Sequence, residues 1–525
     1  MLFFGLVLAA LASLTAAKTP SVACKAFADV TAEASFAQKN VTITATTHYA
    51  AGALNVSALD SSTLALGEPD LNVYGLCRVE GWINSTGHSL AFELWLPDAA
   101  LWNGRYLGMG NGGLAGSVTP GVLAYGANRG YAVAQSDSGH EFPAEFAAGD
   151  GVNIPFLHSK TATADWIRDS VHYTAVAAKY LVSVFYGNPA TYSYYQGCST
   201  GGAQGLALAQ RHPADFNGIQ AGAPGAYYSH LALSFLWNSR AMTSRNVSVS
   251  TAELEAIQAA AIAQCDALDG LEDGLITNPL VCDFDVASME CGKATGDVCL
   301  SAEQVAAMQE VYAGAHDPVT LDRLYNKFWP GSEGGLVVQE GGLTSSFTTP
   351  LMQNLWKNNL TYDAGTEFDF HADVASYDEI VGGQIDDIDT DLSAFLQNHR
   401  GKLLVHQGWS DQYNAQDFPI EYYKGVASTA ELSLPELARS FRVFYQPGVE
   451  HCGGGYGPNV FDGVAALVNW VENGVAPDRI VATQYVNNTV ALGVQRTRPY
   501  CPWPQQAVYR GHGSTDSATS FVCKE

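Results

Sequence analysis

Residues 191–211 read TYSYYQ, GCSTG and GAQGLALAQR in succession, so the pentapeptide Gly197-Cys198-Ser199-Thr200-Gly201 separates a strand-like stretch from a helix-like stretch. A G-x-S-x-G pattern at such a junction is typical of a nucleophile elbow, in which small flanking residues let the helix approach the strand. The alternative is an ordinary Gly/Ser turn, because the pentapeptide alone occurs often by chance. The flanking strand and helix favour the elbow and predict Ser199 as a nucleophile.

A serine nucleophile needs a base, and the base needs an orienting acid. In α/β-hydrolases the chain order is serine, acid, histidine. Asp411 follows the apolar stretch KLLVHQG and His451 follows FRVFYQ, which places both at predicted strand ends. His406 and His140 are the alternative bases, but His406 precedes the acid and His140 precedes the serine. We therefore predict a Ser199–Asp411–His451 triad.

Stabilising the oxyanion requires N–H donors aimed at the reacting carbonyl. The start of a helix offers such groups, so the N–H of Thr200 is one candidate. A second donor is expected from the glycine-rich segment RYLGMGNGGLAG at residues 105–116, at Gly112 or Gly113. The same segment also fits a G-x-G-x-x-G nucleotide loop. That alternative is disfavoured because no helix-forming stretch is expected after it and no strand with a terminal acid follows at the required distance.

Short apolar stretches alternate with helical ones on both sides of a long irregular middle section, which indicates βαβ units around a parallel sheet. The expected elements are strands at 131–135, 191–196, 403–408 and 441–446, and helices at 164–185, 202–211 and 461–473. Far more residues separate Ser199 from Asp411 than the roughly 60 to 70 that two βα units need. We predict an α/β-hydrolase fold with catalytic segments 18–225 and 397–525 and an inserted lid domain at 226–396.

The first residues, MLFFGLVLAALASLTAA, resemble a secretory signal peptide covering residues 1–17. Ten cysteines suit an oxidising compartment. Asparagine sequons for glycosylation occur at Asn40, Asn55, Asn84, Asn246, Asn359 and Asn487. A formal charge of −26 disfavours nucleic acid and anionic membranes as partners. These features predict a secreted, extracellular protein.

Cys198 directly precedes the predicted nucleophile and Cys452 directly follows the predicted base. This Cys-Ser…Asp…His-Cys pattern resembles the fungal tannase and feruloyl esterase family, as do GNGGLAG, DSVHYTAVAAKYL, GCSTGG, CDALDGLEDGLI and VENGVAP. The resemblance spans nearly the whole mature chain. It implies a serine carboxylesterase with five disulfides: Cys24–Cys77, Cys198–Cys452, Cys265–Cys282, Cys291–Cys299 and Cys501–Cys523.

The acidic segment from Cys265 to Leu275 is the candidate metal site. Calcium prefers carboxylate and carbonyl oxygens, but the spacing here is not that of an EF-hand. From the residues alone, a solvated acidic turn and a metal loop are equal alternatives. The family resemblance implies structural calcium in the lid, held by side chains of Asp266, Asp269 and Asp273 and by carbonyls of Leu271 and Leu275.

The resemblance implies a feruloyl esterase that releases ferulic or related hydroxycinnamic acids from plant cell-wall sugars. A tannase that cleaves gallate esters is the alternative within the family, because the residues that select the phenolic ring would lie in the irregular lid. A catalytically inactive extracellular binding module is the alternative of another class. The presence of Ser199, Asp411 and His451 together argues against it.

Overall fold

The computed structural model describes residues 19–33, 41–59, 68–84, 88–114, 116–140, 153–294 and 296–525, with the backbone alone at 28–33. The predicted signal peptide and Asn40 lie outside these ranges. The chain divides into two compact units, each described by itself below. The first comprises Met1–Phe142, Ser159–Gln220 and Ser393–Lys402, and the second comprises Pro143–His158, Ala221–Leu392 and Leu403–Glu525.

The elements of the first unit are α2 (Pro20–Glu33), β1 (Val41–Tyr49), β2 (Leu76–Asn84), β3 (Ser89–Pro97), β4 (Arg105–Met109), α3 (Pro120–Ala127), β5 (Ala132–Ser136), α4 (Lys160–Ala164), α5 (Ser170–Tyr186), β6 (Tyr192–Cys198) and α6 (Thr200–Arg211). Its strands lie in the order β1-β2-β3-β5-β4-β6. The pairings from β1 to β5 are antiparallel, whereas β4 pairs in parallel with both β5 and β6. Every residue of β5 is buried, as expected for a strand covered on both faces.

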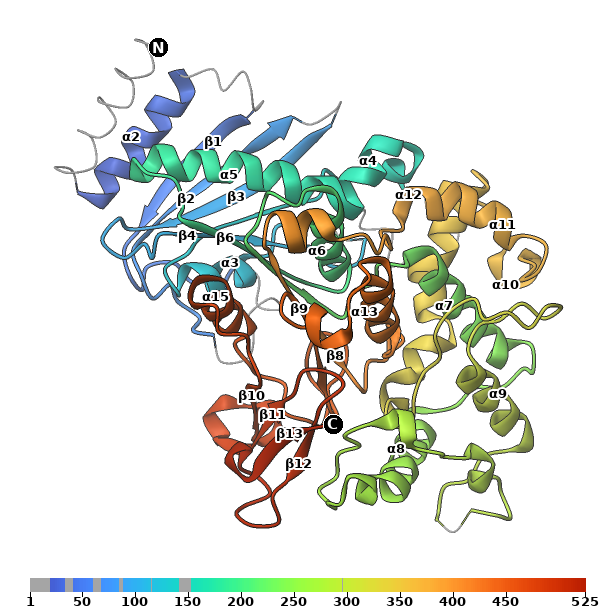
Figure 1. Ribbon diagram of the computed structural model, residues 1–525. Helices are drawn as coiled ribbons and strands as arrows, with labels where there is room; N and C mark the ends of the chain where they lie inside the picture. Colours follow the sequence, from blue (N-terminus) through green and yellow to red (C-terminus); the bar gives the residue numbers. More distant parts are fainter. Residues whose placement is uncertain are drawn as a thin grey trace. The chain divides into compact units, whose positions relative to one another are not determined.

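Helices α3, α5 and α6 pack on the strands of this sheet, and Figure 1 shows α5 running along it. The helix predicted at 164–185 is interrupted, since a π-helical turn at Asp165–Asp169 separates α4 from α5. This wider turn contains the fully buried Trp166, whose indole donates to the carbonyl of Gly113 at 2.9 Å. Helix α3 was not expected after the glycine-rich segment, and it begins at Pro120, whose fixed φ suits a first turn.

Strand β7 (Gly218–Gly222) leads into the second unit. Its other elements are α7 (Tyr228–Thr243), α8 (Thr251–Cys265), α9 (Ala302–Ala313), α10 (Ala364–Glu367), α11 (Val374–Tyr377), α12 (Gly383–Ile385), β8 (Lys402–Gly408), α13 (Phe418–Thr429), α14 (Leu434–Leu437), β9 (Phe441–Gln446), α15 (Gly463–Asn473), β10 (Ile480–Tyr485), β11 (Val494–Tyr500), β12 (Gln506–Tyr509) and β13 (Phe521–Lys524).

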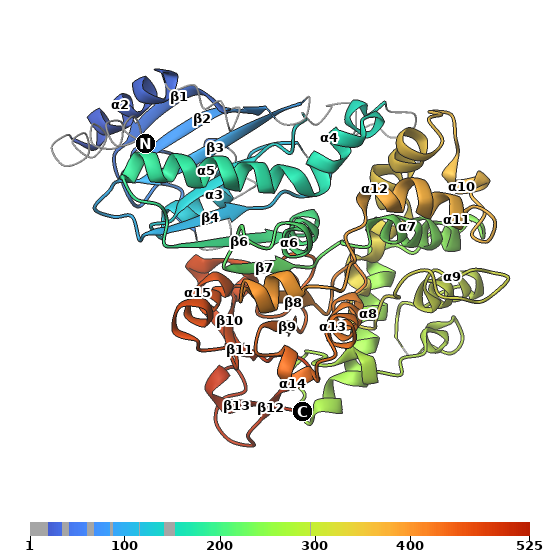
Figure 2. The ribbon, with the colours of Figure 1, turned by 45° about the horizontal axis from the view of Figure 1, so that its top comes forward.

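The segment predicted as a lid, 226–396, is helical and irregular, and apart from the undescribed Thr295 it contains no strand. Both predicted capping boxes are present, at Ser250 with Glu253 before α8 and at Ser301 with Gln304 before α9. Helices α7 and α9 pack together and lie side by side in Figures 1 and 2. The second unit also contains 403–525, so the boundaries proposed for a separate lid domain stay a prediction.

Strands β8 and β9 pair in parallel, with Leu403 opposite Phe441 and Gly408 opposite Gln446. Parallel neighbours end at the same edge, so the loops that follow them emerge together. Two antiparallel hairpins, β10–β11 and β12–β13, complete the unit (Figure 1). No helix within the described ranges is long and apolar enough to cross a membrane.

Candidate active site

Ser199 lies between β6 and α6 in a conformation that residues with side chains seldom adopt. Its φ of 63° and ψ of −121° make it the sharp turn from strand to helix. Glycine is required on both sides of Ser199 because backbone carbonyl oxygens lie too close to leave room for a side chain. A Cβ at Gly197 would lie 2.4 Å from the carbonyl oxygen of Gly201, and a Cβ at Gly201 would lie 2.7 Å from that of Asn111. The backbone therefore has the geometry of a nucleophile elbow.

The glycine-rich loop after β4 is fastened to the first turns of α6. Gln204 accepts a hydrogen bond from the N–H of Asn111 at 2.9 Å, and the Thr200 hydroxyl donates to the carbonyl of Gly113 at 3.1 Å. Thr200 is the first residue of α6, so its N–H has no partner within the helix. Gly112 is exposed in the same loop. The sequence-predicted donors Thr200, Gly112 and Gly113 thus belong to one rigidly connected region of the first unit.

Asp411 and His451 come together in the second unit, as the strand-end argument predicts. Nδ1 of His451 lies 2.8 Å from Oδ2 of Asp411. Asp411 is fully buried, and its other oxygen accepts the N–H groups of Tyr413 and Asn414 at 2.8 and 2.9 Å. Because a carboxylate only accepts hydrogen bonds, Nδ1 of His451 is the donor and Nε2 is left as the base. Ser199 belongs to the other unit, and its pairing with His451 stays a prediction.

Three further residues hold this pair, and the sequence reasoning did not identify them. Gln407 donates to Oδ2 of Asp411 at 2.8 Å, and Gln412 accepts from the N–H of His451 at 3.0 Å. The ring of Tyr413 stacks on the imidazole with centroids 4.7 Å apart. Nearness to Asp411 in the sequence is the only signal that would have marked them.

His406 and His140, the two alternative bases, each lie against an oxygen atom that holds the ring in place. His406 is buried on β8 with Nδ1 3.3 Å from the amide oxygen of Gln446, and burial lowers its pKa to about 4. His140 lies 2.8 Å from the carbonyl oxygen of Leu114, and burial lowers its pKa as well. These two contacts are made with a backbone carbonyl and an amide oxygen, and neither is the contact with a carboxylate that orients a catalytic base.

The acidic segment forms a tight loop ordered by two of its carboxylates. Asp266 accepts the N–H groups of Asp273, Gly274 and Leu275 at 3.2, 2.8 and 3.2 Å. Asp269 accepts the N–H of Leu271 at 2.9 Å. The carboxylates and the carbonyls of this loop are hard oxygen donors of the kind that calcium takes.

Two other groups compete for these carboxylates. Arg498 pairs with Asp273, and the Thr277 hydroxyl donates to Asp269 at 2.5 Å. Burial raises the pKa of both Asp269 and Asp273. The donor types fit a calcium ion, and Arg498 already supplies part of the positive charge that the loop needs.

One group of metal-ligand side chains within 4.8 Å of one another is found among the described residues, and it comprises His172, His212 and Asp215. The two imidazole rings stack 3.7 Å apart at an interplanar angle of 10°. Their in-plane lone pairs therefore run side by side and do not converge on one ion. Nδ1 of His172 is already 2.5 Å from Asp215. We interpret this group as a structural hydrogen-bonded pair covered by a stacked ring.

The cysteines and sequons follow the expected pattern as far as they are described. Four disulfides have the pairings that the family resemblance implies: Cys24–Cys77, Cys265–Cys282, Cys291–Cys299 and Cys501–Cys523. Cys198 and Cys452 are each in a disulfide too, and their pairing with one another stays a prediction. The described sequon asparagines are all exposed: Asn55, Asn84, Asn246, Asn359 and Asn487.

Comparison with known proteins places this geometry in a family. The model of the tannase and feruloyl esterase family matches residues 77–524. An uncharacterized esterase of Xanthomonas campestris is 35% identical, over 89% of this chain and 88% of the relative. A probable feruloyl esterase B-1 of Aspergillus oryzae is 30% identical, over 92% and 90%.

A solved structure gives the same result. The crystal structure of feruloyl esterase B from Aspergillus oryzae superimposes with a TM-score of 0.83 at 29% identity, covering 96% of this chain and all of that one. The alternation of strands and helices around a mixed sheet, the strained serine after β6 and the acid–histidine pair after β8 and β9 are what an α/β-hydrolase contains. The chain therefore belongs to the tannase and feruloyl esterase family and is a carboxylic ester hydrolase with the α/β-hydrolase fold.

Proposed function

We propose that this chain is a secreted serine esterase that releases ferulic and related hydroxycinnamic acids from plant cell-wall polysaccharide. The observation that carries the serine mechanism is the backbone of Ser199, a non-glycine residue at φ 63° between β6 and α6. Strain of this kind persists only where the surrounding structure enforces it, and it is concentrated at functional sites. Relatives named as feruloyl esterase B support the substrate class.

In the proposed mechanism, Oγ of Ser199 attacks the ester carbonyl while Nε2 of His451 takes its proton. The same proton then passes to the leaving alcohol, and water repeats the sequence on the acyl-enzyme. Asp411 holds the imidazole through Nδ1 and stabilises its positive charge. The N–H of Thr200, with an N–H of Gly112 or Gly113, would bind the oxyanion.

The phenolic ring that the enzyme prefers is tested by direct comparison. Methyl ferulate, methyl caffeate and methyl gallate should be hydrolysed side by side by the wild-type protein and by Ser199→Ala. The proposed esterase has its highest kcat/KM on methyl ferulate or methyl caffeate, both hydroxycinnamates, and Ser199→Ala is inactive on all three esters. The highest kcat/KM on methyl gallate would identify a tannase, and full activity of Ser199→Ala would exclude the serine mechanism.

Secretion is part of the proposal. Four described disulfides and five exposed sequon asparagines suit an extracellular protein. The apolar residues 1–17 would be removed as a signal peptide. Edman sequencing of the protein recovered from the medium of a fungal host should give an N-terminus at or near Lys18. Retention inside the cell with residues 1–17 intact would contradict secretion.

We further propose that the acidic loop holds one calcium ion through the side chains of Asp266, Asp269 and Asp273 and the carbonyls of Leu271 and Leu275. Bound calcium would supply only charge neutralisation. The hydrogen bonds that residues 273–275 donate to Asp266 already bring them back towards the end of α8, so the chain itself forms the loop. We assign the ion a structural role.

A further inference from the structure

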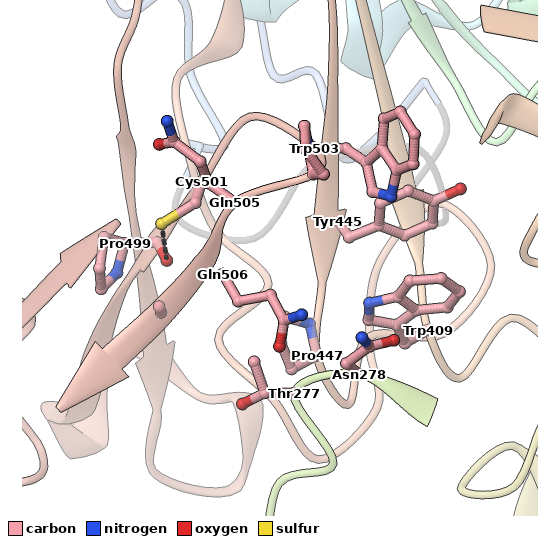
Figure 3. A pocket seen from close by; sticks show the side chains of 12 residues that line it. Thr277, Asn278, Trp409, Tyr445, Pro447, Pro499, Cys501, Trp503, Gln505 and Gln506 are labelled. Atoms are coloured by element: carbon pink, nitrogen blue, oxygen red, sulfur yellow. Dashed lines mark hydrogen bonds between the residues drawn. The ribbon is translucent and has the colours of Figure 1, made fainter. Parts of the chain in front are cut away.

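A small pocket in the second unit has no part in the mechanism above. It has a volume of about 200 Å³ and lies among the ends of β8 and β9, the connection from β11 to β12, the start of β12, and the segment Thr277–Asn278 (Figure 3). Six side chains carry the argument: Thr277, Asn278, Trp409, Tyr445, Trp503 and Gln506. No lining residue forms a hydrogen bond to Asp411 or His451 within the described ranges.

The pocket is uncharged, although the protein carries a formal charge of −26. Its lining consists of aromatic, amide, proline, cystine, threonine and alanine side chains, with no Asp, Glu, Lys, Arg or His. A phosphate, a carboxylate or a metal ion would therefore lose its hydration with no opposite charge to replace it. A ligand of this pocket is neutral.

Trp409 presents a buried and unused hydrogen-bond donor to this space. Its ring stacks on that of Tyr445 at 3.8 Å and 14°, and only 4% of the residue is exposed. Its indole N–H makes no hydrogen bond to any described residue, and Figure 3 shows it on the side of the ring that faces Gln506. The hydroxyl of Tyr445 is used elsewhere, since it donates to the carbonyl of Gln416 at 3.0 Å.

The opposite wall supplies amide groups. The side chain of Gln506 has no hydrogen-bond partner among the described residues, and Asn278 uses its oxygen to accept from the N–H of Leu280 at 3.1 Å. The NH₂ group of Asn278 and both ends of the Gln506 amide remain available, so the pocket offers donors and an acceptor beside aromatic rings.

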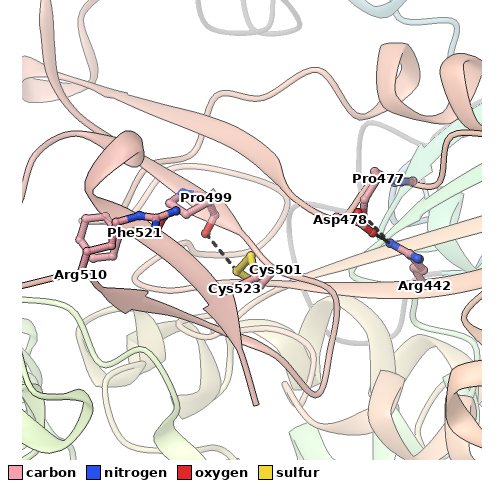
Figure 4. The surroundings of a disulfide bond; sticks show 8 residues. All are labelled: Arg442, Pro477, Asp478, Pro499, Cys501, Arg510, Phe521 and Cys523. Atoms are coloured by element: carbon pink, nitrogen blue, oxygen red, sulfur yellow. Dashed lines mark hydrogen bonds and ion pairs between the residues drawn. A yellow bond between two sulfur atoms is a disulfide. The ribbon is translucent and has the colours of Figure 1, made fainter.

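Contacts within the protein hold the backbone of two walls in place. The Thr277 hydroxyl donates to Asp269 of the acidic loop, and Gln506 pairs across the hairpin with Lys524. The disulfide Cys501–Cys523 braces the base of that hairpin (Figure 4). The backbone of the site is thus formed in advance, and a ligand would have to order the Gln506 side chain.

We propose that this pocket binds one neutral sugar unit of the polysaccharide that carries the ester. A sugar ring has apolar C–H faces that pack on aromatic side chains and a rim of hydroxyls that match amide and indole groups. A single sugar ring fits a cavity of this volume, which is smaller than the cavities that bind drug-sized ligands. A phenolic ring would leave most of the amide donors unpaired. The inference rests on the proposed function in one respect, which is that the sugar belongs to a plant cell-wall polysaccharide.

Binding is measured by isothermal titration of xylohexaose, which carries no ester bond, into Ser199→Ala. Gln506→Leu and Trp409→Phe are each added to Ser199→Ala. The first removes the amide with little change in side-chain size, and the second removes the indole N–H together with one of the two fused rings. Each should weaken binding about fivefold or more, as the loss of one hydrogen bond does. Gln495→Leu, at an exposed glutamine on β11, is the matched control and should bind as the parent does.

A second measurement separates the pocket from the catalytic site. In proteins that retain Ser199, Gln506→Leu should raise KM for feruloylated arabinoxylan and leave kcat/KM for methyl ferulate within twofold. Absence of xylohexaose binding, or binding that ignores both substitutions, would overturn the proposal. A matching loss on methyl ferulate would reassign the pocket to the phenolic ring. If the wild type hydrolyses no feruloyl ester, the proposed function fails while the titration still decides the pocket.

Discussion

Gln407 and His451 share one oxygen of Asp411. The amide nitrogen of Gln407 and Nδ1 of His451 each lie 2.8 Å from Oδ2 of the buried carboxylate. Gln407 is the next-to-last residue of β8, so the strand itself directs the amide towards the acid. Hydrogen bonds to a carboxylate favour its charged form. Gln407 is thus a positioning residue that keeps Asp411 ready to pair with the imidazole.

Replacing Gln407 with Leu should lower kcat about tenfold and change KM little, because the binding of the ester does not involve this amide. Loss of the donor frees the Asp411 carboxylate, and with it the imidazole, to leave the orientation that the reaction needs. Gln397→Leu, at an exposed glutamine, is the control. A kcat within twofold of wild type would refute the role.

The proposed triad is tested by removing its members one at a time. Ser199→Ala and His451→Ala should each lower kcat by about 10⁴-fold or more, because the residues act as a unit. Asp411→Asn should cost somewhat less, since the acid orients and balances the imidazole without reacting. Circular dichroism would show whether the fold survives. Turnover near normal in the Ser199 variant on all phenolic esters would rule out the mechanism.

Much of the fold and the site was predictable because the signals are local. The strand predicted at 441–446 matches β9, and the capping boxes at Ser250 and Ser301 need only residues three positions apart. The elbow at Ser199 likewise depends on adjacent residues. The chain order and strand ends then sufficed to select Asp411 and His451.

The features that were missed depend on contacts between distant segments. The π-helical turn at Asp165–Asp169 accompanies Trp166 packing against Gly113, which lies far away in the sequence. The three antiparallel strands β1, β2 and β3 have no turn signal comparable with the βαβ rhythm of the later chain. Gln407 is one glutamine among many until the bend after β8 brings Asp411 back to it.

The proposed calcium site predicts a stability effect with little effect on chemistry. A chelator should lower the melting temperature by a few degrees, and added calcium should restore it, because an ion bound only by the folded state stabilises it by about 3 kcal/mol at one hundred times its Kd. Asp269→Asn should abolish that response and leave kcat unchanged, whereas Asp297→Asn, at an exposed aspartate, should keep it. Melting curves of wild type that ignore both chelator and calcium would exclude the site.

The raised pKa of Asp386 predicts how the free energy of unfolding varies with pH. Burial raises its pKa to about 7, against about 3.8 in an unfolded chain, and its oxygens accept the N–H and hydroxyl of Ser229 at 2.9 and 2.6 Å. Between these values the folded state binds the extra proton, so this group makes the protein less stable as pH rises from about 4 to 7. Asp386→Asn can keep both contacts without the charge. Its melting temperature should fall less over this range than that of wild type or of the exposed-site control Asp322→Asn. Parallel curves would contradict the assignment.

The last prediction concerns the cysteines beside the catalytic residues. Cys198 immediately precedes Ser199, and Cys452, with φ at 62°, immediately follows His451. Both are disulfide-bonded, and we expect them to be bonded to each other. Such a bridge would fix the serine and histidine loops together, and a displacement of about 1 Å at such a site costs on the order of 100-fold in rate.

A Cys198→Ala, Cys452→Ala double variant should therefore be secreted and folded but lose most of its activity. In the chain-entropy model, a bridge that closes so long a loop adds up to about 5 kcal/mol to the free energy of unfolding. The melting temperature of the double variant should therefore fall as well. The matched control is Cys291→Ala, Cys299→Ala, which opens a bridge spanning only 8 residues in the second unit and should keep kcat. Peptide mapping of the unreduced wild type tests the pairing directly. A peptide that joins Cys198 to any cysteine other than Cys452 would contradict the pairing. There would then be no reason to expect the two double variants to differ in activity.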